Sequence, residues 1–155
     1  MKRISLRAAI AILAFSIPAA ADAAGSSAPV EEKPQSYELG MAAADSENWE
    51  SAIRHFAEAI DADPKDADAY NMLAYSQRQA GDLESAFANY EIALGIDPAH
   101  EEALEYLGEA YLLVGDLDSA ILQLEKLDEI CRGGCEAFYE LQEAIDEFQA
   151  SRNSN

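Results

Sequence analysis

Apolar and small residues recur along most of the chain at the three- and four-residue spacing of α-helices. Between Tyr70 and Leu94 they lie on one side of two successive helical segments, which are separated at Gly81. Glycine suits the end of the first segment, because a left-handed residue is favoured there. Pro64 and Pro98 each follow a second segment, where they stop a helix. The pattern predicts an all-α chain built from short paired helices.

The helical pattern itself repeats with a period of 34 residues. The positions that keep this step are Leu39, Leu73, Leu107 and Leu141; Ala52, Ala86 and Ala120; Phe56, Tyr90 and Leu124; Ala59, Ala93 and Leu127; and Pro64 and Pro98. A single helix pair cannot bury both of its faces. Stacking of neighbouring copies therefore has to supply the core.

The period and the residues at these positions resemble the tetratricopeptide repeat. The leucine–glycine pair of that repeat is matched by Leu39-Gly40 and by Leu107-Gly108, and Tyr111 follows at the tyrosine position. The resemblance extends from about Ser36 to Phe148. It implies a right-handed all-α solenoid of three helix-turn-helix repeats with a C-terminal capping helix.

The chain divides into segments of different composition. We expect a signal peptide at 1–23, a flexible tether at 24–35, a repeat domain at 36–150 and a disordered tail at 151–155; within the domain the repeats cover about 36–66, 67–100 and 101–134, and the capping helix covers 135–150.

The signal peptide is predicted from a basic start, an apolar run over 8–21 and the small-residue pattern Ala21-Asp22-Ala23. An uncleaved membrane anchor fits less well, because the run is short, alanine-rich and interrupted by Pro18. The mature protein is thus expected to be periplasmic and to have no membrane span.

Acidic residues dominate the charged positions. Asp and Glu number 30 against 10 Lys and Arg, which gives a formal net charge of −20. Nucleic acids and anionic membranes attract cationic patches, so neither is an expected partner. A protein or peptide partner with a basic segment is favoured instead.

Cys131 and Cys135 flank a Gly-Gly turn, and in an exported protein such a pair usually oxidises. We expect a structural disulfide that ties the capping helix to the third repeat. A metal site or a redox-active dithiol is the alternative. No further metal ligand lies near in sequence, and no Cys-x-x-Cys motif is present.

No catalytic motif is found, and we expect neither an enzyme nor a cofactor. A nucleophile elbow, a phosphate-binding glycine loop and a zinc-protease motif are all missing from the sequence. His55 and His100 are interpreted as surface or packing residues.

In the family that the chain resembles, the first helix of each pair lines a groove that holds a partner peptide. Carried over by position, the groove residues are Tyr37, Met41, Asn71, Tyr75, Arg78, Glu102, Glu105, Glu109 and Tyr139, with Asp68, Leu112 and Leu113 on the same face. The glutamates at 102, 105 and 109 form one stripe along a helix. Glu105 and Glu109 stand where a receptor for a terminal carboxylate would need cations, so a cationic, partly apolar segment suits the groove better.

The sequence therefore predicts a non-catalytic, monomeric interaction scaffold in envelope assembly or secretion. The alternatives are a redox or metal-handling protein that uses Cys131 and Cys135, and end-to-end homo-oligomerisation. The acidic capping helix argues against the latter, because like charges would meet.

Overall fold

The computed structural model describes residues 33–132 and 134–153. In these residues the chain forms seven α-helices and no strand. The helices are α1 (Gln35–Asp45), α2 (Trp49–Ala62), α3 (Ala67–Gln79), α4 (Leu83–Ile96), α5 (Glu101–Leu113), α6 (Leu117–Cys131) and α7 (Glu136–Asn153). The expected signal peptide and most of the expected tether lie outside the described residues.

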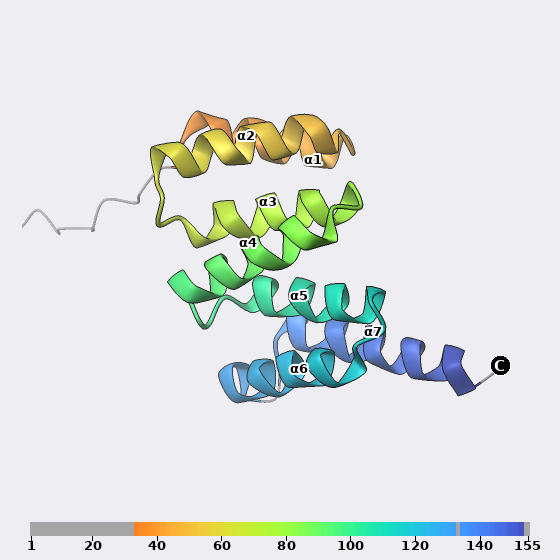
Figure 1. The fold of residues 1–155 in the computed structure, drawn as a ribbon. Coiled ribbons are helices and arrows are strands. Elements are labelled where there is room, and N and C mark those ends of the chain that lie inside the picture. The colour runs from red at the N-terminus through yellow and green to blue at the C-terminus, as the bar shows by residue number, and fades with distance from the viewer. Residues whose placement is uncertain (1–32, 133, 154–155) are drawn as a thin grey trace, which may run out of the picture. The chain divides into compact units, whose positions relative to one another are not determined.

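The helices form three antiparallel pairs that stack in chain order, with α7 packed against both helices of the last pair (Figure 1). Helix α3 packs on α4 within its pair and on α2 and α5 in the neighbouring pairs, while α7 packs on both α5 and α6. This arrangement confirms the predicted solenoid of three repeats and a capping helix. We call the side formed by α1, α3, α5 and α7 the first-helix face.

The turn inside each pair follows the 34-residue register. Gly81 and Gly115 adopt positive φ angles of 87° and 81°, as their position after a first helix predicts. The first repeat carries Glu47 there, with φ of 55°. The next helices are capped by Asn48, Asp82 and Asp116, and the side chain of each accepts a hydrogen bond from the backbone N–H three residues on.

Two glycines allow close helix packing. A Cβ on Gly40 would lie 2.7 Å from the Phe56 ring, and a Cβ on Gly108 would lie 2.6 Å from the Leu141 methyl groups. Both partners are fully buried. Glycine at these two positions therefore brings α1 against α2, and α5 against α7.

The structure differs from the expected boundaries at both ends of the repeat domain. Lys33 is held by ion pairs with Asp66 and Asp68, so the last part of the expected tether is attached to the domain. Helix α7 runs to Asn153, three residues past its expected end. Its last turn is held by a hydrogen bond from the Ser151 hydroxyl to the Phe148 carbonyl and by Arg152 over the Phe148 ring. Residues 154–155 lie outside the described part.

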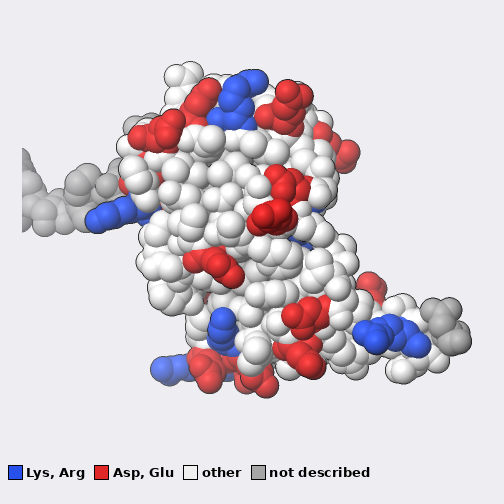
Figure 2. All heavy atoms as spheres, in the orientation of Figure 1, with Lys and Arg blue, Asp and Glu red and all other residues white. Residues whose placement is uncertain are grey.

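Acidic side chains are scattered over the surface. The face in Figure 2 carries several separate groups of Asp and Glu and fewer Lys and Arg side chains. Across the described ranges, no helix has the length and apolar character needed to cross a membrane.

Candidate functional site

A row of aromatic rings runs across the helix pairs. The centroids of Trp49 and Tyr75 are 5.9 Å apart, and those of Tyr75 and Tyr106 are 5.1 Å apart. The guanidinium of Arg78 lies 5.3 Å and 5.5 Å from the two tyrosine rings. It also forms an ion pair of 2.5 Å with Glu109. The rings and Arg78 thus couple α3 to α5, and Glu109 neutralises the charge of Arg78.

Glu105 is withdrawn from solvent, with only 5% of its surface exposed. It is hydrogen-bonded to Glu140 of α7. Burial, together with this bond and the charges of Glu140 and Glu109, raises the pKa of Glu105 to about 8, although Arg78 acts in the opposite direction. Two members of the predicted stripe of three glutamates are therefore engaged within the protein: Glu105 joins α5 to α7, and Glu109 pairs with Arg78.

At the N-terminal end of the first-helix face, a lysine joins two carboxylates. Lys33 Nζ lies 2.5 Å from Asp66 Oδ1 and 2.7 Å from Asp68 Oδ2. It is also 5.0 Å from the centre of the Tyr37 ring. Burial opposes ionisation of Asp68, but the hydrogen bond and charge of Lys33 outweigh it and hold the pKa of Asp68 below its usual value.

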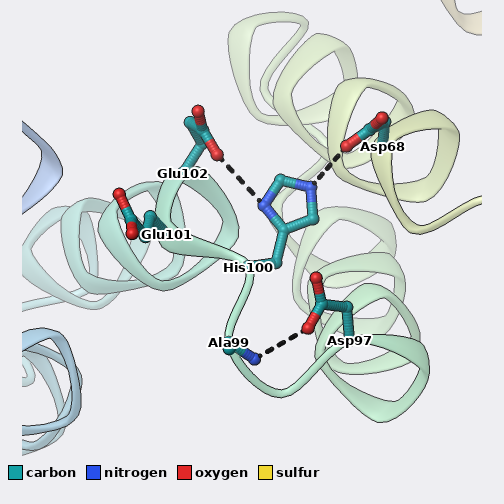
Figure 3. A pocket seen from close by; sticks show the side chains of 6 residues that line it. All are labelled: Asp68, Asp97, Ala99, His100, Glu101 and Glu102. Atoms are coloured by element: carbon teal, nitrogen blue, oxygen red, sulfur yellow. Dashed lines mark hydrogen bonds and ion pairs between the residues drawn. The ribbon is translucent and has the colours of Figure 1, made fainter. Parts of the chain in front are cut away.

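His100 lies between the acidic side chains of two helices (Figure 3). Its Nδ1 accepts a hydrogen bond of 3.3 Å from the backbone N–H of Ala103 and so caps α5. The proton of the neutral ring is therefore on Nε2. The nearest acceptor to Nε2 is Asp68 Oδ1 at 3.0 Å, but the two are not aligned as a hydrogen bond. Glu102 Oε2 lies 3.3 Å from Nδ1, which has no proton to offer it.

His100 separates two clefts that share its ring, Asp68 and Glu102. One, of about 260 Å³, extends toward Asp97 and Glu101 and is the cleft in Figure 3. The other, of about 240 Å³, lies among α1, α3 and α5; we call it the end cleft.

Asn71 is the most deeply buried polar residue that lines the end cleft. Only 3% of its surface is exposed, and its Oδ1 has no hydrogen-bond partner among the described residues. A buried amide without a partner costs free energy, so such a group in a folded domain suggests a ligand.

An apolar cleft of about 250 Å³ lies farther along the same face. Leu112 and Leu113 of α5 and Ala144 of α7 form its walls, and the Arg78–Glu109 pair lies beside them. Leu113 is 63% exposed, so an apolar side chain on the wall of this cleft is open to solvent.

The sulfur atoms of Cys131 and Cys135 form a disulfide bond, with the two Cα atoms 5.5 Å apart. This pairing agrees with the prediction. A carboxylate oxygen of Glu101 and the two sulfur atoms all lie within 4.8 Å of one another. Sulfur atoms that are bonded to each other are not thiolate ligands, so a metal could bind here only after reduction.

The sequence-predicted residues thus fall into separate groups. Tyr37, Asn71 and Glu102 surround the end cleft, and Tyr75, Arg78 and Glu109 meet in the aromatic row. Met41 packs against the core of the first pair, and Tyr139 packs edge-on against Phe138 at 59% exposure.

Sequence reasoning missed His100, Lys33 and the α7 residues Glu140 and Ala144. One signal was available for His100. It follows Asp66 by one period of 34 residues, and Asp66 caps α3 as His100 caps α5.

The helix pairs and their 34-residue register are matched by known families. Two tetratricopeptide-repeat models match the chain, one over residues 37–101 and the other over residues 77–145. The chain belongs to the tetratricopeptide-repeat family. No curated protein matches its sequence.

Solved structures with the same fold cover most of the chain. The TPR2B domain of yeast Sti1 in its pHsp70 complex has a TM-score of 0.67 and 21% identity, covering 75% of this chain and 94% of that chain. The type III secretion translocator chaperone SycD of Yersinia enterocolitica has a TM-score of 0.68 and 18% identity, covering 77% and 84%. The Sgt2 domain from Aspergillus fumigatus has a TM-score of 0.67 and 25% identity, covering 79% and 83%.

Proposed function

We propose that this protein is a non-catalytic scaffold that binds a protein or peptide partner along its first-helix face. The observation that carries the proposal is the pair of open clefts on that face. The end cleft contains the unpartnered amide of Asn71, and the apolar cleft has the exposed side chain of Leu113 on its wall. Together they offer polar and apolar contacts along one side of the solenoid.

The family supports the same function. The Sti1 domain was solved with pHsp70, and SycD is a secretion chaperone, so similar solenoids bind protein partners.

The charges on the first-helix face differ from those of a receptor for an acidic tail. Arg78 is engaged by Glu109, and Lys33 by Asp66 and Asp68. The free charges that remain on the face are mainly negative, which favours a partner with a basic segment.

We further propose that the protein acts in the periplasm, in envelope assembly or secretion. The disulfide of Cys131 and Cys135 supports an oxidising compartment, and the composition of residues 1–23 supports export.

Two variants, each with a photo-crosslinking residue on a different side of the solenoid, test the proposal in cells. Leu113 is on the first-helix face and Leu122 of α6 is the matched control, since both leucines are largely exposed, at 63% and 54%. A discrete adduct from position 113 and none from position 122 is expected. The crosslinked protein is expected in the periplasmic fraction, with Ala24 as its first residue. Equal labelling from both positions, or labelling from 122 alone, would refute the first-helix face as the binding surface.

A redox or metal-handling function is the second candidate. The cluster of Glu101, Cys131 and Cys135 is the observation that favours it. It ranks second because metal binding at this cluster requires the disulfide to be reduced, whereas the first-helix face needs no such change.

A further inference from the structure

The end cleft presents acceptors that no aligned donor meets, and the unpartnered Nε2–H of His100 that also lines it lies 3.0 Å from a carboxylate oxygen, Asp68 Oδ1. Among the described residues, Asn71 Oδ1, an atom that is itself fully buried, has no hydrogen-bond partner, and the carboxylate of Glu102 lies beside the unprotonated Nδ1 of His100. Asp68 adds a second carboxylate to the same cleft. The two ends of an amide are exchanged by a half-turn of the side chain, so the Asn71 oxygen can face the cleft without a backbone change. A ligand that fits has to supply N–H donors.

The N-termini of α3 and α5, which lie at the cleft, do not form an anion-binding site. Helix N-termini attract negative charge through their free N–H groups. Here the side chain of Asp66 caps α3, and His100 caps α5. With the carboxylates of Asp68 and Glu102 also at the first turns, the local charge repels a phosphate or carboxylate and attracts a cation.

The chain already places one ammonium group against this cleft. Lys33 contacts Asp68 Oδ2 and lies over the Tyr37 ring, so its ammonium already occupies one carboxylate oxygen and one aromatic face that line the cleft. Lys33 leaves Glu102 and Asn71 on the other side without a donor. The ring of Tyr106 borders that side. Aromatic faces suit both a cation and the methylene stem of a lysine.

We propose that the end cleft binds the side-chain ammonium of a lysine in the partner, with Asn71, Glu102 and Oδ1 of Asp68, the oxygen that Lys33 leaves free, as acceptors and the Tyr106 ring along the stem. An ammonium has three donors on a compact head, which matches three acceptors in a cleft of about 240 Å³. A planar guanidinium is wider and prefers a bidentate carboxylate. The inference rests on the proposed function, because the lysine belongs to the segment bound on the first-helix face.

The direct test uses the full chain, labelled with ¹⁵N, and a pair of small probes. Nα-acetyl-lysine methylamide carries the ammonium, and Nα-acetyl-norleucine methylamide has the same stem without the charge. The lysine probe is expected to shift the Asn71 side-chain amide resonances with saturation, and to bind about fivefold or more tightly than the norleucine probe. Equal binding of the two probes, or shifts spread over the acidic surface without saturation, would overturn the proposal.

Variants separate this cleft from general charge attraction. Glu102→Gln removes one acceptor charge at an exposed position, and Asn71→Leu replaces the amide by an apolar side chain with the same number of heavy atoms. Each is expected to weaken the lysine probe about fivefold, while Glu129→Gln, an exposed change on α6, leaves it unchanged. If neither cleft variant changes the affinity, the cleft is not the site. Circular dichroism and the melting temperature of each variant exclude misfolding as the cause.

Two further measurements complete the test. The diamine 1,5-diaminopentane distinguishes a lysine side chain from a free polyamine: weaker binding than the lysine probe is expected, and tighter binding would overturn the lysine assignment.

In the second measurement, the partner crosslinked at position 113 is bound to the Glu102→Gln protein. Unchanged partner affinity would refute the lysine site and leave the scaffold function standing, whereas lost crosslinking with intact probe binding would refute the scaffold alone.

Discussion

Single residues that depart from the 34-residue register mark where this chain differs from a regular repeat. His100 stands at the position of Asp66, and both side chains accept a backbone N–H at a helix start. The change replaces a carboxylate by a ring that has a second nitrogen available to the cleft. Glu47 stands at the position of Gly81 and Gly115 and keeps their positive φ. The backbone thus repeats even where the residue type does not.

The buried carboxyl pair predicts a pH dependence of stability. The pKa of Glu105 is raised to about 8 in the folded protein, through burial, Glu140 and Glu109, so the folded state binds more protons than the unfolded chain above the ordinary glutamate pKa. The contribution of protonated Glu105 to the free energy of unfolding is therefore fully present below pH of about 4.5 and is lost as the pH rises to about 8.

Glu105→Gln removes the ionisable group but keeps an amide that can donate to Glu140. The variant is expected to be more stable than the unaltered protein at pH of about 9, by about 1 kcal/mol or more, and to lose less stability between pH of about 5.5 and 9. Urea unfolding at the two pH values measures this. Glu143→Gln, an exposed change on α7, is the control and should follow the unaltered protein. Parallel pH profiles for Glu105→Gln and the unaltered protein would contradict the buried pair.

Helical periodicity could place Asn71, Arg78 and Glu102 on one face, because each helix has a fixed spacing of positions. It could not show that Glu105 is buried. That depends on where α7 packs, and Glu140 lies 35 residues later in the chain. The pairing of Arg78 with Glu109 likewise depends on the contact of α3 with α5. Local pattern therefore predicted the face, and tertiary contacts determined which of its side chains remain free.

At the scale of whole helices, close approach depends on individual glycines. Gly108 lets the fully buried Leu141 of α7 pack directly on the α5 backbone. The sequence indicated this through the leucine–glycine pairs, which the repeat uses for the same purpose. The extra turn of α7 had no such signal, because its contacts form within the last turn itself.

Two glycine-to-alanine changes with opposite expected signs test this packing. Gly108→Ala places a Cβ 2.6 Å from Leu141 and is expected to lower the unfolding free energy by about 1–3 kcal/mol. Gly95→Ala in α4 meets no heavy atom within 4 Å, and helix propensity predicts a gain of about 0.5 kcal/mol. Thermal unfolding of both proteins measures the difference. A Gly108→Ala protein as stable as Gly95→Ala would show that α5 and α7 are not packed as described.

At the scale of the whole molecule, stacking gives each helix pair a core that neighbouring elements complete. The last pair depends on α7, since Ala137, Leu141 and Ile145 are buried in one cluster with Leu104 and Leu127. The disulfide between Cys131 and Cys135 fixes α7 to the end of α6. The acidic surface keeps the net charge far from zero, which opposes association of the solenoids with one another.

Removing α7 tests whether it completes this core. A chain that ends before Glu136 exposes Leu104 and Leu127, both at most 1% exposed in the intact protein, and loses burial of about 1.5–3 kcal/mol for each large apolar side chain removed. It is expected to unfold without a cooperative transition or to associate. A chain that lacks only 151–155 loses contacts at the surface, and its free energy of unfolding should stay within about 0.5 kcal/mol of the reference.

Both truncated chains and the reference carry Cys131→Ala and Cys135→Ala, so that a free thiol does not cause association. Urea unfolding and light scattering measure the outcomes. If the longer truncation remained monomeric with an unchanged melting temperature, the third helix pair would be stable alone and α7 would have another role.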